Sequence, residues 1–128
     1  MFKRIIVILV LMVTLVSSSF AVNLQQSIQL ISTNATGAGS ATMLQHPFSI
    51  HGWVVTWSGT VPTSVLVNLE GSLDGTTWYI IKQLTVTTSG TADTESGYMA
   101  NYVRANYVSK VGGDATTTVT VTYIGSGQ

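Results

Sequence analysis

Two carboxylates, Glu70 and Asp74, are the residues whose type and spacing could perform chemistry, because glycoside hydrolysis uses a pair of carboxylic acids. Such a pair acts only if both side chains project into one cleft. Asp74 precedes Gly75, and an Asp-Gly dipeptide between two alternating apolar segments is typical of a tight β-hairpin turn. Glu70 has an outward position on the preceding strand, where Arg104 can pair with it. We therefore interpret both carboxylates as structural.

The other catalytic patterns are also incomplete. The run Gly71-Ser72-Leu73-Asp74-Gly75 differs from a Gly-x-Ser-x-Gly nucleophile elbow, since its serine lies one position early. His46 and His51 flank Pro47 and would face opposite sides of a continuous strand, so they cannot share a metal ion. We expect both histidines at the surface or at a sheet edge, and no cysteine is present.

Calcium is the remaining possibility for a metal. Asp93, Glu95 and Asp114 lie in predicted loops, and the loops of β-sandwiches can collect oxygen ligands. Their spacing matches no fixed run of calcium ligands. The sequence therefore predicts a protein that is not an enzyme, with no catalytic, metal or cofactor site.

The first 21 residues have the three parts of a secretory signal peptide. Lys3 and Arg4 precede an apolar run over residues 5–16, and small residues lead to a cleavage position after Ala21. This run of twelve residues is shorter than the ~20 that a spanning helix needs, which favours cleavage over the alternative, a retained membrane anchor. We predict a signal helix over residues 1–21, one domain over 22–128, and a secreted or cell-surface location, with contact to the membrane only through the signal segment.

The domain that remains after cleavage has few charges. Its 107 residues include three cationic and five anionic side chains, a net charge of −2. Three cations are too few to hold nucleic-acid phosphates, so we exclude that class of partner. Eight charged residues in 107 are well below the ~25% that is usual in soluble domains. We therefore expect either a threonine-rich extracellular domain or a subunit whose faces are covered by neighbours.

Apolar residues recur with a period of two, which predicts an all-β chain. The predicted strands cover residues 27–32, 41–46, 48–57, 64–73, 77–87, 98–109 and 116–124, and residues 34–40 and 89–97 are predicted loops. Seven or eight short strands favour a single antiparallel β-sandwich, with jelly-roll and immunoglobulin-like topologies both open.

The same alternation assigns the two faces of each strand. Inward positions are predicted for Trp53, Val55, Trp57, Val65, Val67, Leu69, Trp78, Val103, Ala105, Tyr107, Val119, Val121 and Tyr123. The opposite parity leaves apolar and aromatic side chains outside. If their strands are neighbours, they form an interaction surface of Val54, Leu66, Tyr79, Ile81, Tyr98, Tyr102 and Arg104. The alternative is that a loop or the N-terminal segment covers these side chains.

Three segments in order resemble a small β-sandwich domain of tailed-phage virion and tail-associated structural proteins. They are Leu69-Glu70-Gly71-Ser72-Leu73-Asp74-Gly75 followed by Thr77-Trp78, then Tyr102-Val103-Arg104-Ala105-Asn106, then residues 116–123. The resemblance covers roughly residues 49–123 and implies a role in assembly or adhesion. The shorter pattern Ser72-x-Asp74-Gly75-x-x-Trp78 resembles the hairpin of discoidin-like carbohydrate-binding domains.

Two functions are consistent with these sequence features. The first is that of a non-enzymatic exported structural protein that binds itself, as a homo-oligomer, or binds another surface or virion protein. The second is that of a carbohydrate-binding module in which Tyr79, Tyr98 and Tyr102 stack against a polysaccharide. Association with a virion is the alternative location. It disagrees with the predicted signal peptide, because virion subunits assemble inside the host cell and do not use an export signal.

Overall fold

The computed structural model describes residues 24–127, and every regular element in this range is a β-strand. The strands are β1 (Leu24–Thr33), β2 (Gly37–Ala38), β3 (Thr42–Met43), β4 (Ile50–Ser58), β5 (Pro62–Ser72), β6 (Tyr79–Val86), β7 (Thr91–Ser96), β8 (Tyr102–Gly112) and β9 (Thr118–Gly127). No helix among the described residues is long and apolar enough to span a membrane. The predicted signal peptide, residues 1–21, lies outside the described range.

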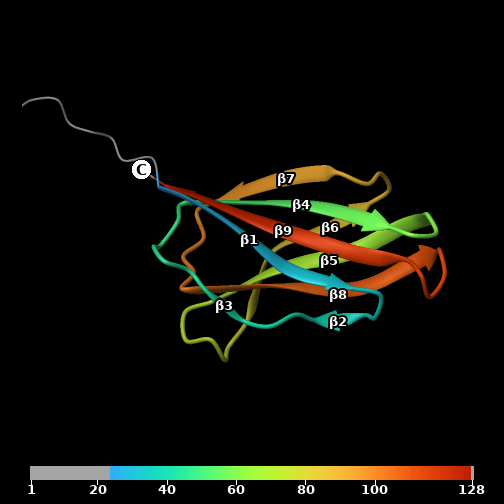
Figure 1. Cartoon of the computed structure of the whole chain (residues 1–128). Helices are drawn as coiled ribbons and strands as arrows, with labels where there is room; N and C mark the ends of the chain where they lie inside the picture. Colours follow the sequence, from blue (N-terminus) through green and yellow to red (C-terminus); the bar gives the residue numbers. More distant parts are fainter. Residues whose placement is uncertain (1–23, 128) are drawn as a thin grey trace, which may run out of the picture.

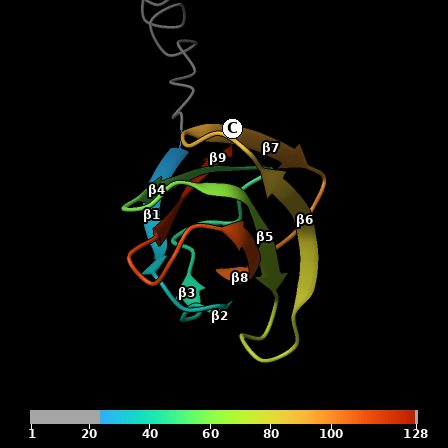
Figure 2. The ribbon, with the colours of Figure 1, turned by 90° about the vertical axis from the view of Figure 1, so that its right-hand side faces the viewer.

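The strands form two antiparallel sheets that pack as a sandwich (Figures 1 and 2), which confirms the predicted architecture. The first sheet has the order β1-β9-β4-β7, and the second has the order β2-β8-β5-β6 with β3 also paired to β8. When β2 and β3 are counted as one interrupted strand, this is the strand order of a jelly roll.

The core lies between the sheets and follows the predicted alternation on most strands. On β9, Val119, Val121 and Tyr123 are fully buried, while the threonines between them face outward. Predicted inward residues that are buried on the other strands are Trp53, Val55, Val65, Val67, Leu69, Val103, Ala105 and Tyr107. Trp57 is partly buried and packs against this core. Alternation with a period of two therefore positions both sheet faces.

Two short segments differ from the prediction. Residues 89–97 were expected to be a loop, but Thr91–Ser96 forms β7 and pairs with β4 at the edge of the first sheet. Because β7 is polar apart from Ala92, it has no apolar alternation to identify it, and its hydrogen bonds to β4 define the strand. In the expected strand 41–46, only Thr42–Met43 pairs with β8, and the expected loop 34–40 contains β2.

The hairpin between β5 and β6 also differs from the expected tight turn. Gly71 pairs with Tyr79, the connection between the two strands runs over residues 73–78, and Trp78 lies on the opposite face from Tyr79. Farther along, Leu69 pairs with Lys82 and Glu70 with Ile80, which leaves Ile81 as an extra residue in a β-bulge.

This register corrects three face assignments. Ile81 was predicted to face outward but is 3% exposed in the core, and Tyr79 packs against the same core. Trp78 was predicted to face inward but is partly exposed on the outer face of the second sheet. The physical reason is that each unpaired residue in a hairpin reverses the parity of every residue that follows it.

Candidate functional site

The β5–β6 hairpin loop is fixed by Asp74. One carboxylate oxygen of Asp74 accepts hydrogen bonds from the backbone N–H groups of Thr77 and Thr76, at 2.7 and 2.8 Å, and from the Ser72 hydroxyl at 2.9 Å. The second oxygen accepts the Thr77 hydroxyl at 3.0 Å. These bonds, that from the Thr77 backbone first, hold the pKa of Asp74 far below its usual range. Asp74 is therefore a turn residue, as the sequence predicts.

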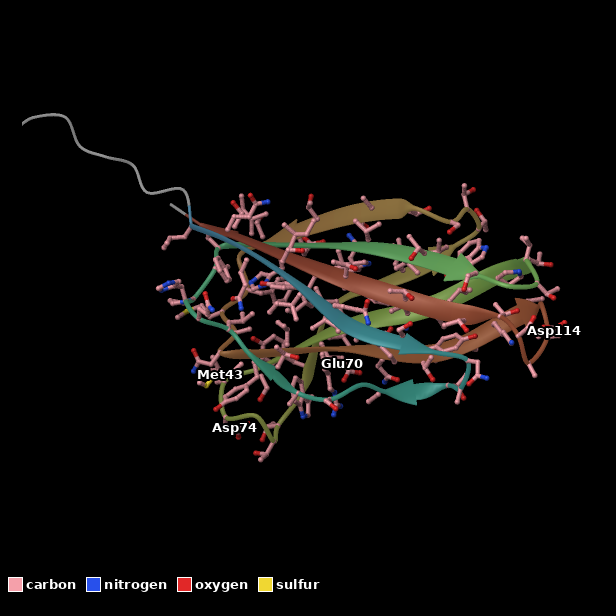
Figure 3. The ribbon with its side chains drawn as sticks, viewed as in Figure 1. Met43, Glu70, Asp74 and Asp114 are labelled. Atoms are coloured by element: carbon pink, nitrogen blue, oxygen red, sulfur yellow. The ribbon has the colours of Figure 1, made fainter. Side chains whose placement is uncertain are left out.

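Glu70 is the centre of a polar network on the outer face of the second sheet (Figure 3). Its side chain is 8% exposed and accepts hydrogen bonds from Arg104 Nε at 2.6 Å and from Asn106 Nδ2 at 2.9 Å. The Arg104 guanidinium lies over the ring of Trp78, 4.2 Å from its centroid. The predicted pairing of Glu70 with Arg104 is confirmed. Since Arg104 and Asn106 occupy the carboxylate, it serves to connect β5 to β8.

The three tyrosines proposed as a sugar platform do not share one face. Tyr79 lies against Gly71 in the interior and its hydroxyl donates to the carbonyl of Met99, and burial raises the pKa of Tyr79. The ring of Tyr98, in the β7–β8 connection, stacks with that of Tyr79 at 6.4 Å and is 37% exposed. Tyr102 packs against Gly75 of the hairpin loop instead. Tyr98 and Tyr102 therefore present separate surfaces.

His51 is buried between the sheets, which corrects the expected surface or edge position. Its Nε2 lies 3.0 Å from the Tyr98 carbonyl, and its Nδ1 lies 2.9 Å from the Tyr123 hydroxyl. A carbonyl oxygen only accepts, so Nε2 donates to it, and in the neutral ring Nδ1 accepts from Tyr123. His46 is exposed in the β3–β4 connection. The two histidines therefore lie in different environments, and the hydrogen bond from His51 to the Tyr98 carbonyl holds the β7–β8 connection against the core.

The carboxylates considered for calcium are separated in the fold. Asp93 and Glu95 lie on β7 and pair with Lys82 at 3.9 and 2.7 Å. Asp114 lies in the β8–β9 connection, at the end of the sandwich opposite Asp74 (Figure 3). Hydrogen bonds, chiefly from Thr116 and then from Thr60, lower the pKa of Asp114 to about 2. Within residues 24–127, no cluster of three or more His, Cys, Asp or Glu side chains could hold a metal ion.

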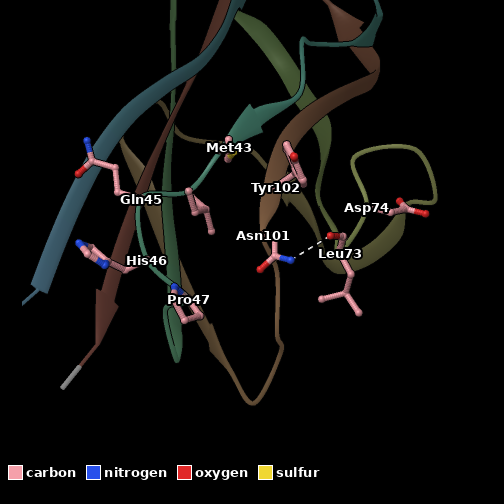
Figure 4. A pocket seen from close by; sticks show the side chains of 9 residues that line it. Met43, Gln45, His46, Pro47, Leu73, Asp74, Asn101 and Tyr102 are labelled. Carbon is pink, nitrogen blue, oxygen red and sulfur yellow. Dashed lines mark hydrogen bonds between the residues drawn. The ribbon is translucent and has the colours of Figure 1, made fainter.

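A groove of about 370 Å³ opens at the end of the sandwich that carries the hairpin loop (Figure 4). The β3–β4 connection lines one wall, and Leu73, Asp74, Asn101 and Tyr102 line the other. Its rim includes Met43 and Leu73, which are 62% and 58% exposed. Asn101 Nδ2 donates to the Leu73 carbonyl at 2.9 Å and fixes the second wall. The groove thus combines apolar side chains with amide, imidazole and phenol groups.

A smaller hollow of about 160 Å³ lies on the outer face of the first sheet. It forms over Gly52 on β4, whose cross-strand partners are Thr94 on β7 and Ile124 on β9. Ile50 and Val54, two residues away on either side, complete its wall. Because Gly52 has no side chain, it leaves an apolar depression between the side chains that project from this face of the sheet.

The interaction surface predicted from parity is divided by the fold. Val54 lies on the first sheet, whereas Leu66, Tyr102 and Arg104 lie on the outer face of the second sheet. Ile81 belongs to the buried core, and Tyr79 is partly buried and packs against that core. Gly52 and Ile124 were not predicted as surface residues of interest, and the signal that could have found them is a glycine interrupting the outward apolar positions of the strand over residues 48–57.

The sequence matches no known protein-family profile, and no curated protein sequence is significantly similar to it. Among solved structures, the crystal structure of the SPBc2 prophage-derived protein YomS has a similar fold, with a TM-score of 0.63. The similarity covers 86% of this chain and 99% of YomS at 12% sequence identity. The chain thus shares its fold with a prophage-derived protein.

Proposed function

We propose that this chain is a non-enzymatic structural protein whose β-sandwich binds copies of itself or another surface protein, as phage structural domains do. The single observation that carries the proposal is the placement of charge. All eight charged side chains between residues 24 and 127 have an intramolecular partner. Five of these side chains form ion pairs, and Asp74 and Asp114 lie in the connections at the two ends of the sandwich. The broad sheet faces therefore have little uncompensated charge and lack much of the repulsion that keeps soluble monomers apart.

The fold similarity supports the same proposal. YomS is described as derived from a prophage, and a match over 99% of its length relates whole domains. Function transferred through a fold is an analogy, so the charge placement remains the physical argument. We extend the proposal to export through residues 1–21 and to a secreted or cell-surface location, with virion association as the alternative.

Size-exclusion chromatography with light scattering tests the proposal on protein expressed from the full-length gene. We expect a mass above that of one chain, increasing with concentration over the micromolar range. A strictly monomeric protein that also captures no surface protein in a cross-linking experiment would contradict the proposal. Mass spectrometry of the native product tests export separately, since cleavage yields a chain that begins at Val22, whereas an intact Met1 contradicts it.

The groove supports a second candidate function, binding of a carbohydrate. Tyr102 supplies an aromatic face at its wall, and Gln45, His46 and Asn101 supply polar groups of the kind that recognise sugar hydroxyls. Tyr102→Ala should then abolish retention on a polysaccharide column, while Tyr98→Ala, outside the groove, should preserve it. Equal retention of both variants and of the unchanged protein contradicts binding at this groove.

A further inference from the structure

The outer face of the first sheet has no charged side chain among the described residues. Its outward positions hold Ile50, Gly52, Val54 and Thr56 on β4, Ala92, Thr94 and Ser96 on β7, Thr118, Thr120, Thr122, Ile124 and Ser126 on β9, and Gln25, Ser27, Gln29 and Ser32 on β1. The charges of β7 point to the other side, where Asp93 and Glu95 pair with Lys82 of β6. Two copies of this face can therefore meet without bringing like charges together.

The face is also close to the size that a stable interface needs. Strands β1, β9, β4 and β7 have ten, ten, nine and six residues. At about 3.4 Å per residue and a spacing of about 4.8 Å, they present roughly 570 Å² of sheet. A standard interface buries ~800 Å² per partner. The outer face of the second sheet is less suited to flat packing, because the hairpin loop folds over it, with Tyr102 against Gly75 and Arg104 over Trp78.

The hollow over Gly52 supplies a register for such a contact. Ile50 is 44% exposed, lies two residues from Gly52 on the same face, and lines the hollow. A two-fold axis that runs parallel to the sheet and crosses β4 midway between these residues would bring Ile50 of each copy over Gly52 of the partner subunit. A cavity of ~150 Å³ accepts a benzene molecule, so a hollow of about 160 Å³ can accept one branched aliphatic side chain.

We infer that two copies of this chain associate back to back through the outer face of the first sheet, with Ile50 of each copy seated in the hollow of the other. Both subunits use the same residues, which makes the contact a closed, isologous interface. The inference rests on the proposed self-association and identifies its partner and surface.

Sedimentation velocity on protein expressed from the full-length gene tests this inference with matched charge substitutions. Ile50→Glu should weaken dimerisation at least tenfold, because it places a carboxylate into an apolar hollow. Ile80→Glu is the control on the outer face of the second sheet, at a residue that is 51% exposed, and should leave the dimer unchanged. Circular dichroism verifies folding, and Val54→Lys serves as a second variant if Ile50→Glu does not fold.

The outcomes separate the two proposals. If Ile80→Glu dissociates the dimer while Ile50→Glu and Val54→Lys do not, the assigned surface is wrong and self-association stands. If the unchanged protein is monomeric at every concentration, self-association fails and this interface fails with it. An equimolar mixture of Ile50→Glu and Ile50→Lys should recover dimers, because opposite charges then lie close together near the axis, and no recovery contradicts the reciprocal geometry.

Discussion

Removal of the Glu70 carboxylate should destabilise the fold by about 2–3 kcal/mol. Glu70 is 8% exposed and accepts hydrogen bonds from Arg104 at 2.6 Å and Asn106 at 2.9 Å. A hydrogen bond to a charged group contributes ~1.5–3 kcal/mol, and breaking a fully buried ion pair costs ~3–5 kcal/mol. Because the Arg104 side chain is 25% exposed, water compensates part of its lost partner, which places the effect below the buried limit.

A double-mutant cycle with Glu70→Ala and Arg104→Ala measures the interaction directly. We expect a coupling free energy of about 1–2 kcal/mol, since neighbouring residues in one network are not additive. Arg104→Ala also loses its contact with the Trp78 ring, a cation–π contact typically of ~0.5–1 kcal/mol, but the cycle separates that loss from the pair. Urea unfolding followed by tryptophan fluorescence provides the free energies, and Trp78 reports on the network itself.

Lys82→Ala is the matched control for the cycle. Lys82 pairs with Glu95 at 2.7 Å, but the two side chains are 37% and 31% exposed, so its loss should cost under about 1 kcal/mol. If the effects of Glu70→Ala and Arg104→Ala are additive within ~0.3 kcal/mol, the two side chains are not coupled and the expected effect is contradicted. A loss of stability in Glu70→Ala no larger than that in Lys82→Ala would contradict it as well.

Two further predictions concern packing and acid stability. Gly125→Ala would place a Cβ 2.4 Å from the ring of Phe48, which is 3% exposed, and should lower the stability in thermal unfolding by about 1–3 kcal/mol. The control Gly127→Ala would place its Cβ at an ordinary 3.7 Å from Phe48 and should be better tolerated. Equal melting temperatures of the two variants would contradict this prediction. Asp74 and Asp114 have lowered pKa values, so their contribution is present above the ordinary carboxyl pKa of ~3.9 and is lost as the pH falls toward 2. Asp114→Asn should therefore reduce the slope of the free energy of unfolding against pH in this acid range, and an unchanged slope would show that its hydrogen bonds are not maintained in solution.

Local sequence patterns were enough to predict the fold class and most of the core. Apolar alternation on a strand is a local property, because successive side chains point to opposite faces of a sheet whatever the strand pairs with. The buried positions of Val119, Val121 and Tyr123, and of Val65 and Val67, therefore agree with the prediction. The role of Asp74 was also predictable, since its hydrogen bonds join residues within three positions of it.

Strand order and the composition of each surface depend instead on long-range pairing. Register shifts depend on the partner strand, so the bulge that turns Ile81 inward and the connection that turns Trp78 outward leave no mark in local alternation. The edge strand β7 exists because β4 offers it hydrogen bonds, and His51 is buried because Tyr123 and the Tyr98 carbonyl satisfy its ring. Residues far apart in the chain become neighbours only when their strands pair. Val54 and Leu66 both point outward from their strands, but β4 and β5 belong to different sheets, so the two side chains lie on opposite sides of the sandwich.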